Sequence, residues 1–501
     1  MPTIKDSSSI EEVLQYIVAC YGVAIYQEKQ RLSNLIADLY TGEERLKRLY
    51  RRMVIEDAVS QQLYAISLKP IQEREGFYNR LVFQFKEANF YEEAFARQVL
   101  DVFLHGMNLL LVEPISTKAT IEDGEWVDEF GAKYSADRKK LIRPPKSLCR
   151  NYHVLDGTVV ICDGVFYFCK TLQEITLPSS VTSIGDRAFV GCWNLQKINV
   201  AESNKVYKTI DGVVYTKDLK TIICYPQGKM NRNFVIPSGV TSIGNYAFYH
   251  CENLQGITLP PGVTSIEDDA FYWCENLQEI NIPSSVISIG DYAFSDCRNL
   301  REINVAESNK VYRTIDGVVY TKDLKTIICY PAGKKDENFV ILSGVTSIGN
   351  NAFYNCNKLR EINIPSSVTS IGERTFDRCE NLQEITLPQG VISIGERTFE
   401  YCSNLREITL PSSITNIGNN AFYNCNKLRE ITIPSSVTSI EDGAFWNCDY
   451  LQEITLPSSV MSIRANVFVG CKNLKRINIP AGTLEKFKEL LPGWTDKLHE
   501  V

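Results

Sequence analysis

A repeat of 23 residues dominates this chain. Its clearest copy is residues 359–381, LREINIPSSVTSIGERTFDRCEN, and Leu382 begins the next copy. A period of 20 to 50 residues is typical of solenoids, in which each repeat forms one coil and contacts only its neighbours. Length alone would divide 501 residues into about three domains. The repeat instead predicts one long stack of coils over roughly the last three-quarters of the chain.

Each copy contains the groups that a coil needs. Pro365 ends a first short strand because it has no N–H for a ladder. Gly372 permits a tight bend before the coil closes. A single coil cannot bury its own apolar groups, so its neighbours must cover them. The positions expected to point into this shared core are Leu359, Ile362, Ile364, Val368, Ile371, Phe376 and Cys379.

Two wider coils interrupt the regular period. The Phe of successive copies recurs mostly every 23 residues, but two intervals of 59 contain extra hairpin-like segments at 198–236 and 303–341. The whole block from Cys192 to Cys297 is repeated 105 residues later. Residues 131–145 match 212–226, which predicts a third wide coil near 128–150. The solenoid should therefore begin near residue 128.

The 16 cysteines do not suggest a disulfide framework. Equivalent side chains of stacked coils lie about 4.8 Å apart but point the same way, whereas a disulfide needs converging Cβ vectors. We expect buried thiols that act as small apolar groups. Eleven cysteines occupy one column: Cys169, Cys192, Cys251, Cys274, Cys297, Cys356, Cys379, Cys402, Cys425, Cys448 and Cys471.

The consensus LxxIxIPxSVTSIGxxAFxxCxxL closely resembles the BspA-like, or Treponema pallidum-type, leucine-rich repeat. The resemblance covers about 350 of the 501 residues. It implies an arc-shaped leucine-rich-repeat solenoid with a parallel β-sheet on one face, either α/β or mainly β with short helical turns. Members of this family are chiefly bacterial and protist proteins that act in adhesion and in binding other proteins, and many are secreted or attached to the surface.

The two ends of the chain have helical patterns. Residues 1–112 lack the repeat and show apolar residues at helical spacing, which predicts an all-α bundle of about five helices and a putative adaptor role. Residues 113–127 are read as a linker, and 128–480 as the solenoid. In residues 481–501, Thr483 is expected to cap a short helix that covers the last coil with Leu484, Phe487, Leu490 and Leu491.

Charge and composition exclude several classes of protein. The formal net charge is -7, which argues against nucleic acid as the main partner. No apolar run approaches the roughly 18 residues of a membrane span. Residues 1–22 lack a basic stretch followed by an unbroken apolar run, so we expect no signal peptide. A cytoplasmic location is therefore expected, with a surface or secreted location as the alternative.

No catalytic set is present in the sequence. The four histidines, His105, His153, His250 and His499, occupy unrelated contexts, and neither a metal-ligand spacing nor a CxxC pair occurs. No phosphate-binding glycine motif occurs either. We therefore expect no catalytic residue, no metal and no cofactor, although an enzyme within the N-terminal bundle is left open as a third possibility.

One candidate binding surface follows from strand alternation. The position before Ile362 should point outward and form a column along the sheet. Like charges about 5 Å apart repel by on the order of 1 kcal/mol. The column is either a soluble face offset by Arg301, Arg360, Arg406 and Arg429, or an acidic strip for a basic partner. It reads Glu174, Lys197, Gly256, Glu279, Glu302, Glu361, Glu384, Glu407, Glu430, Glu453 and Arg476.

The second candidate surface is aromatic. The two residues between the Phe and the Cys of each copy vary while their frame stays constant. Tyr and Trp are frequent binding hot spots, although these rings could instead pack between coils. The aromatic residues at these positions are Tyr249, His250, Tyr272, Trp273, Tyr354, Tyr401, Tyr423 and Trp446. The two surfaces together predict a non-enzymatic scaffold that binds a protein, with a BspA-type surface adhesin as the alternative.

Overall fold

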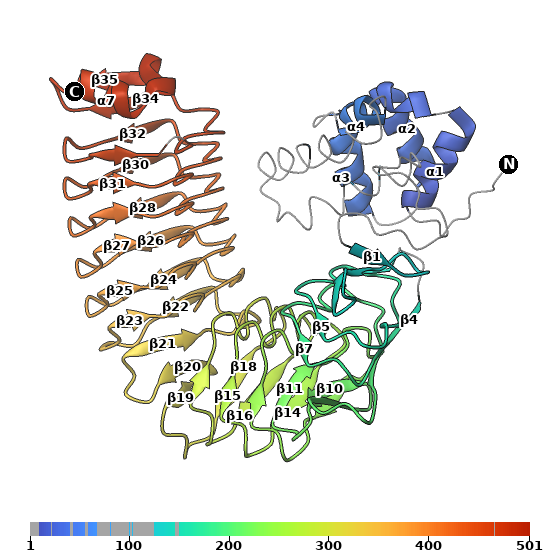
Figure 1. The fold of residues 1–501 in the computed structure, drawn as a ribbon. Coiled ribbons are helices and arrows are strands. Elements are labelled where there is room, and N and C mark those ends of the chain that lie inside the picture. Colours follow the sequence, from blue (N-terminus) through green and yellow to red (C-terminus); the bar gives the residue numbers. More distant parts are fainter. Residues whose placement is uncertain are drawn as a thin grey trace. The chain divides into compact units, whose positions relative to one another are not determined.

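We describe the fold from a computed structural model of the chain. It describes residues 10–21, 23–40, 44–55, 59–67, 81, 100, 103, 125–145, 150–464 and 466–501. The chain forms two compact units, Met1–Glu129 and Phe130–Val501. Each unit is described by itself below (Figure 1).

The first unit is helical. Its described elements are α1 (Ile10–Tyr21), the 3-10 helix η1 (Val23–Gln27), α2 (Lys29–Leu39), α3 (Glu44–Ile55), α4 (Val59–Ser67) and the strand β1 (Glu125–Val127). Amphipathic periodicity explains the packing, because Val13, Leu14 and Ile17 of α1 are fully buried together with Leu32 and Ile36 of α2. The predicted helical character of this segment is confirmed as far as it is described.

One predicted position in this unit differs from the structure, and two predicted helices lie mostly outside the described residues. Helical spacing predicts that Tyr21 shares a face with Val13, Leu14 and Ile17, but Tyr21 is 46% exposed, since it ends α1, and Arg31 lies over its ring at 5.0 Å. The spacing of Phe77, Leu81 and Phe85, and of Phe95, Val99, Leu100 and Phe103, predicts two further helices, which lie mostly outside the described residues. Within them Leu81, Leu100 and Phe103 are buried in the core of the unit.

In the second unit every regular coil contributes one strand to a front sheet. The strand alternates outward and inward residues, as in Glu384–Thr386, where only Ile385 is buried. Neighbouring front strands are parallel, and the sheet is divided into four parts. Its strands are β4 (Asn151–His153), β6 (Glu174–Leu177), β8 (Lys197–Val200), β12 (Asn233–Val235), β14 (Gly256–Thr258), β16 (Glu279–Ile282), β18 (Glu302–Val305), β22 (Asn338–Val340), β24 (Glu361–Asn363), β26 (Glu384–Thr386), β28 (Glu407–Thr409), β30 (Glu430–Thr432), β32 (Glu453–Thr455), β34 (Arg476–Ile479) and β35 (Leu498–Glu500).

A second set of strands, mostly of two residues, forms the back sheets. They come from the SI step of each copy and stack in parallel register, for example Ile394 beside Ile417. They are β5 (Val160–Ile161), β7 (Ser183–Ile184), β13 (Ser242–Ile243), β15 (Ser265–Ile266), β17 (Ser288–Ile289), β23 (Ser347–Ile348), β25 (Ser370–Ile371), β27 (Ser393–Ile394), β29 (Asn416–Ile417), β31 (Ser439–Ile440) and β33 (Ser462–Ile463). The leucine-rich-repeat solenoid predicted from the sequence is confirmed.

The wide coils add antiparallel strands to the back sheets. Each of the two complete wide coils is a three-stranded meander, and the coil near 128–150 is a two-stranded hairpin. The strands are β2 (Lys133–Ser135), β3 (Lys140–Arg143), β9 (Tyr207–Ile210), β10 (Val213–Thr216), β11 (Thr221–Cys224), β19 (Tyr312–Ile315), β20 (Val318–Thr321) and β21 (Thr326–Cys329). The wide coils therefore interrupt the front sheet, because β8 does not pair with β12 and β18 does not pair with β22.

Short-range chemistry explains the shape of the wide coil. Asp211 and Gly212 both have positive φ between β9 and β10, which is the two-residue turn that Asp-Gly favours in hairpins. A Cβ on Gly212 would lie 2.9 Å from the side chain of Lys197, so the close approach also requires glycine. Asn204, fully buried, accepts hydrogen bonds from the N–H groups of Val206 and Tyr207 and fixes the entry to β9.

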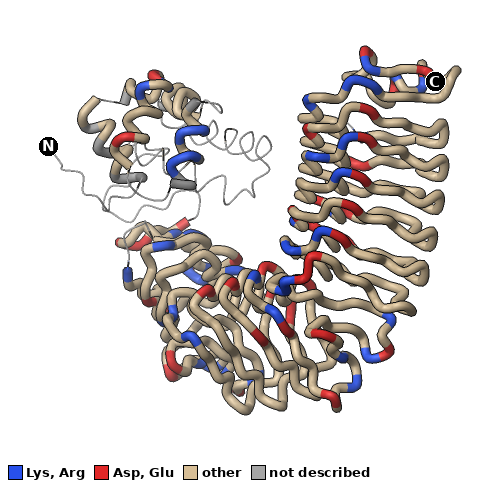
Figure 2. The backbone as a smooth tube through the Cα atoms, turned by 180° about the vertical axis from the view of Figure 1, so that it is seen from behind, with Lys and Arg blue, Asp and Glu red and all other residues tan. Residues whose placement is uncertain are grey.

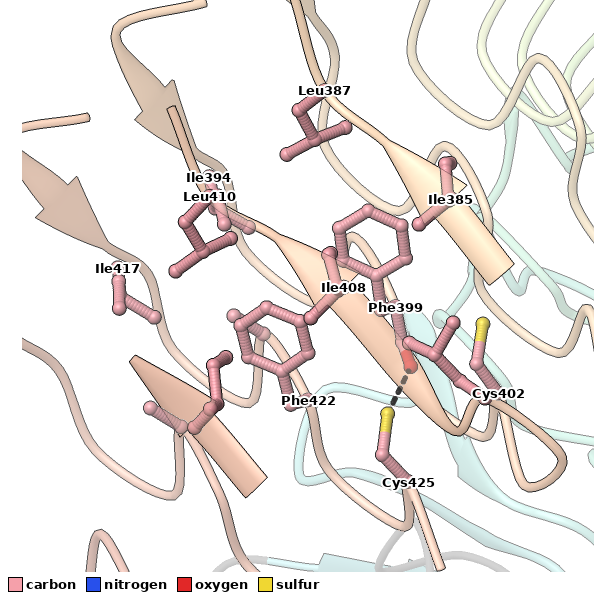
Figure 3. Packing of buried hydrophobic residues seen from close by; sticks show 14 of the residues in the cluster. Ile385, Leu387, Ile394, Phe399, Cys402, Ile408, Leu410, Ile417, Phe422 and Cys425 are labelled. Atoms are coloured by element: carbon pink, nitrogen blue, oxygen red, sulfur yellow. Dashed lines mark hydrogen bonds between the residues drawn. The ribbon is translucent and has the colours of Figure 1, made fainter. Parts of the chain in front are cut away.

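A spine of stacked rings runs through the solenoid core. Phe399 and Phe422 stack with centroids 5.3 Å apart (Figure 3). Phe422 also stacks on Phe445 at 5.2 Å. All three side chains are fully buried. In the wide coils Tyr225 and Tyr330 take the position of the Phe, stacking on Phe248 and Phe353, respectively. The predicted inward residues of the 359–381 copy lie in this core.

The cysteine column lies beside the rings. The Cys425 thiol donates a weak hydrogen bond to the carbonyl of Phe399 at 3.2 Å (Figure 3). The Cys402 thiol likewise donates to the carbonyl of Phe376 at 3.1 Å. Each thiol thus joins one coil to the previous one. Burial raises the pKa of Cys402 and Cys425, so both remain protonated donors at neutral pH.

The C-terminal residues cover the last coil. Helix α7 (Leu484–Leu490) buries Phe487, the 3-10 helix η2 (Pro492–Lys497) follows, and the Trp494 ring meets Phe468 edge-on at 5.7 Å to end the spine. Thr483 stands at the N-cap, but its hydroxyl donates to the Pro480 carbonyl instead of accepting from the helix. The Glu500 carboxylate accepts the N–H of Leu484, because β35 brings it to the start of the helix.

Candidate protein-binding surfaces

The acidic column lies on the exposed face of the front sheet. Glu279 stands directly beside Glu302 in the parallel register, and Glu384 stands between Glu361 and Glu407. Glu430 stands beside Glu453. All seven side chains are exposed. The backbone thus places carboxylates about 4.8 Å apart along the stack. Figure 2 shows acidic segments that recur from coil to coil.

Direct ion pairs neutralise the column only at its start, where Lys197 pairs with Glu174 at 3.6 Å, as far as the chain is described. Within the described residues none of the seven glutamates forms a salt bridge, and Arg360 pairs with Glu337 at 3.5 Å. Glu453 alone accepts a side-chain hydrogen bond, from Asn478. The neighbouring arginines therefore do not cap the carboxylates, which remain available to an external cationic group. This geometry favours the acidic-strip interpretation over self-compensation.

The second surface is the loop edge, where each coil turns around its Phe. In each loop two residues have positive φ, the left-handed backbone conformation. They lie two positions before and two positions after the Phe, as Asp269 and Trp273 do around Phe271. Main-chain hydrogen bonds then join consecutive loops. The N–H groups of Asp269, Phe271 and Trp273 donate to carbonyls of the next coil at 2.9, 2.9 and 3.0 Å. We call this pattern the loop ladder.

Five of the predicted aromatic residues form one cluster on this edge. Tyr249 stacks on Tyr272 at 5.3 Å, and His250 lies 4.7 Å from Trp273. The Tyr272 and Tyr354 hydroxyls are 3.1 Å apart, so the cluster spans the second wide coil. Tyr354 is buried and the other four are half-buried. Burial raises the pKa of Tyr272, which keeps its hydroxyl protonated.

The other three aromatic residues form a second cluster. Tyr401 meets Tyr423 edge-on at 5.3 Å, and Tyr423 meets Trp446 at 6.2 Å. Arg378 lies over the Tyr401 ring at 4.9 Å. Tyr423 is only 2% exposed, whereas Tyr401 and Trp446 are half-buried. Rings of both clusters therefore pack between coils while presenting part of their surface.

Buried carboxylates beneath the edge were not foreseen. Asp269 lies near Arg187 and Tyr246, and its burial raises its pKa to about 6. Burial likewise raises the pKa of Asp377, and the nearby charge of Glu400 raises it further. The burial of these carboxylates could not be predicted from the sequence. It depends on which side chains the adjacent loops place over them, and these residues differ from loop to loop.

Two further features escaped the sequence analysis. Val235 of β12 and Val340 of β22 are 70% and 67% exposed on the front sheet, each just after a wide coil. Two small cavities also open at the loop edge beside the wide coils. Notch 1, of about 170 Å³, lies between residues 184–190 and 244–249, and notch 2, of about 110 Å³, lies between 289–295 and 349–351.

Metal and membrane sites find no support in the described part of the chain. No group of three or more potential metal ligands is found there. Among the described helices, none has the length and apolar character that crossing a bilayer requires.

The sequence profile of the BspA type Leucine rich repeat region matches residues 147–227, 223–332, 329–452 and 374–490. The chain belongs to this BspA-type leucine-rich repeat family. The matched residues comprise the regular coils and both complete wide coils described above. None of the curated proteins compared with the chain matches it significantly.

Several solved structures resemble this BspA-type protein. The pneumococcal vaccine antigen PcpA is 19% identical over 77% of this chain and 98% of its own, with a TM-score of 0.51, which supports the solenoid fold. A leucine-rich cell surface protein of Faecalibacterium prausnitzii is 25% identical over 75% and 98%, with a TM-score of 0.45. A leucine-rich repeat protein of Bacteroides ovatus is 27% identical over 78% and 100%, with a TM-score of 0.41.

Proposed function

We propose that this BspA-type protein is a non-enzymatic interaction scaffold whose front sheet binds a basic protein partner. The observation that carries the proposal is the row of seven exposed carboxylates on β16, β18, β24, β26, β28, β30 and β32, which form no salt bridge within the described residues. Keeping like charges in register opposes folding. Arg476 stands beside Glu453 at the end of the row, but within the described residues none of the seven glutamates forms an ion pair, so a ligand explains the row better than stability does.

The loop edge is the second part of the proposal. The half-buried rings of Trp273 and Tyr401 offer rigid, partly exposed aromatic area of the kind that anchors protein interfaces. Tyr354 and Tyr423 are buried and would support their neighbours from below. The N-terminal helical unit would couple the solenoid to another component.

A charge-removal experiment tests the front sheet. A random peptide library displayed on phage is selected on the full-length protein, and selected peptides should be enriched in Lys and Arg. The triple variant Glu361→Gln, Glu384→Gln, Glu407→Gln should lose at least tenfold in affinity for them, and raised salt should weaken wild-type binding. The matched control Arg301→Gln, Arg406→Gln, Arg429→Gln removes charge from the neighbouring column and should retain binding.

The opposite result would redirect the proposal. Selected peptides without basic residues, bound equally by the glutamine variant, would remove the acidic strip as the binding surface. The alternative function is that of a surface adhesin of the BspA type, which the family suggests. Fractionation of the native cells separates the two, because an adhesin must be accessible to protease on intact cells whereas a cytoplasmic scaffold is not.

A further inference from the structure

The loop ladder is interrupted at both complete wide coils. In regular coils the N–H groups at the Phe and two positions to either side donate to the next loop. Before the first wide coil, the N–H groups of Phe189 and Gly191 have no partner in the described chain. Before the second, the same holds for Tyr292, Phe294 and Asp296. Buried main-chain donors are almost always paired, because an unpaired one loses its hydrogen bond to water without gaining another.

The opposite walls of the two notches carry unpaired acceptors. The carbonyls of Asn245 in notch 1 and Asn350 in notch 2 receive no hydrogen bond from any described residue. One rung is replaced by the wide coil itself, since the Tyr225 N–H donates to Ala247 at 2.7 Å and the Tyr330 N–H donates to Ala352 at 2.7 Å. Each notch therefore has main-chain donors on one wall and acceptors on the other.

Side chains reach across both notches and also add acceptors: Arg187 donates to the Tyr246 hydroxyl at 2.9 Å in notch 1, and Asn350 donates to Asp291 at 3.5 Å in notch 2. In notch 1 the Gln227 amide donates to the Tyr249 carbonyl at 2.7 Å, while its own Oε1 is buried and has no partner. In notch 2 the Oδ1 of Asn351 is likewise buried and unpaired. Both residues are only 7% exposed. Each notch thus contains a buried amide oxygen that requires a donor.

The dimensions suit one strand of peptide. An inserted coil separates the notch walls by about two strand spacings, or about 10 Å. The wide coil takes the middle position at Tyr225 or Tyr330, so a segment entering the notch beside that residue would lie at pairing distance from the remaining groups of both walls. The cavities of about 170 and 110 Å³ exceed the roughly 30 Å³ share of one water molecule. They leave room for a main chain with small side chains.

We propose that each notch binds a short extended segment of a partner protein, whose main chain completes the interrupted loop ladder. The proposal rests on the scaffold function proposed above and gives its loop edge a definite ligand. Carbonyls of the segment accept from Phe189 and Gly191, or from Phe294 and Asp296, and its N–H groups donate to Asn245 or Asn350. This is strand addition to an open ladder, with small residues such as Gly, Ala and Ser at the inserted positions.

A peptide main chain fits the walls better than an ion. An anion would satisfy the donors but would leave the carbonyls and the Gln227 oxygen unpaired, and Asp186 or Asp291 lies at the wall of each notch. A cation would satisfy the carboxylate and carbonyl oxygens but not the N–H groups. An extended peptide supplies acceptors and donors in alternation, as both walls require.

The test uses peptides selected from a random heptapeptide library on the full-length protein. Individual amides of a selected peptide are N-methylated in turn. Methylation at alternate positions should weaken binding at least tenfold, whereas methylation between them should change it less than twofold. Hydrogen exchange of the wild-type protein gives a second readout, because bound peptide should slow exchange at Gly191 or Asp296 at least tenfold and leave Trp273 unchanged.

Two single-residue variants, one at each notch, show which notch a selected peptide binds. Cys224→Leu and Cys329→Leu place a larger side chain at the wall of notch 1 and notch 2, and each should abolish binding at its own notch only. The Glu361, Glu384, Glu407 glutamine variant should bind these peptides normally, so failure of the notches is distinguishable from failure of the acidic strip. Selected peptides that tolerate N-methylation everywhere and leave Gly191 and Asp296 exchange unchanged would overturn the proposal and leave water as the only occupant.

Discussion

The two wide coils contain a matched pair of tyrosines that should respond in opposite ways to the same substitution. Tyr225 and Tyr330 are 2% and 3% exposed and stack on Phe248 and Phe353 at 5.2 and 5.1 Å. The Tyr330 hydroxyl donates to Asp336 at 2.9 Å, but the Tyr225 hydroxyl is buried without a partner. Asn231 occupies the position equivalent to Asp336. The pair therefore differs mainly in one hydrogen bond.

The magnitudes follow from that difference. A buried hydroxyl without a partner costs about 1–3 kcal/mol, so Tyr225→Phe should stabilise its coil by at least about 1 kcal/mol. A hydrogen bond to a charged group contributes about 1.5–3 kcal/mol. The Asp336 side chain is 46% exposed, which places Tyr330→Phe near the lower end, at a loss of about 1.5 kcal/mol. The ring and its stacking stay the same in both variants.

Native-state hydrogen exchange is the suitable assay, because stability in a repeat protein is distributed over local units. Exchange within residues 221–225 should slow at least fivefold in Tyr225→Phe, and exchange within 326–330 should quicken about tenfold in Tyr330→Phe. Each segment serves as the control for the other variant. Adding Asn231→Asp should give Tyr225 an acceptor and reverse the sign of Tyr225→Phe. A shift in the same direction for both single variants would refute the reasoning.

Four further predictions follow from the core and its buried polar groups. Phe422→Ala should lower the free energy of unfolding by about 3–5 kcal/mol, because the Phe422 ring is fully buried between two stacked rings. Urea unfolding measures this loss, and hydrogen exchange of main-chain amides should rise most in the adjacent coils. Asn309→Ala should cost about 2–4 kcal/mol, measured likewise, since it leaves the carbonyls of Pro283 and Val286 and the N–H groups of Val311 and Tyr312 unpaired. Asp269 has a pKa near 6 in the folded protein, so between about pH 4 and 6 it keeps a proton that the same residue loses in the unfolded chain. The free energy of unfolding should therefore fall by up to about 3 kcal/mol as pH rises through this range. Asp269→Asn should flatten this pH dependence, which urea midpoints measure. Iodoacetamide at pH 8 should modify exposed Cys20 and spare the buried column thiols until the protein unfolds, as mass spectrometry would show.

The repeating frame was accessible from the sequence because each of its residues has one physical role in every coil. Leu359, Ile362 and Phe376 recur at fixed spacing, and the structure buries all three. The outward glutamates were equally accessible, since strand alternation alone places Glu361 on the exposed face. Strand alternation could not predict which arginine, if any, forms an ion pair with each glutamate. Whether Arg360 reaches Glu361 or Glu337 depends on side-chain paths that the period does not specify.

The aromatic edge was less accessible, because exposure there depends on which residues neighbouring loops contribute. Tyr354 and Tyr401 occupy variable positions in their own repeats, yet Tyr354 is buried beneath Tyr272 and Tyr292, and Tyr401 keeps part of its surface. The Asp-Gly pair at 211–212 was a stronger signal that could have been used. It predicts the tight hairpin of the wide coil, and with it the loss of one loop from the edge.

The notches show why a repeat sequence can conceal a binding site. Most residues around them belong to regular repeats, and in the wide coil Tyr225 takes the place of the repeat Phe. The unpaired groups are main-chain N–H groups, those of Phe189, Gly191, Phe294 and Asp296. Every residue except proline has such a group, so residue identity does not reveal which ones are unpaired. They become unpaired because the next coil lacks the loop that would have accepted them. Sites of this kind should therefore be sought where the period is broken, at the 59-residue intervals, rather than where repeat residues vary.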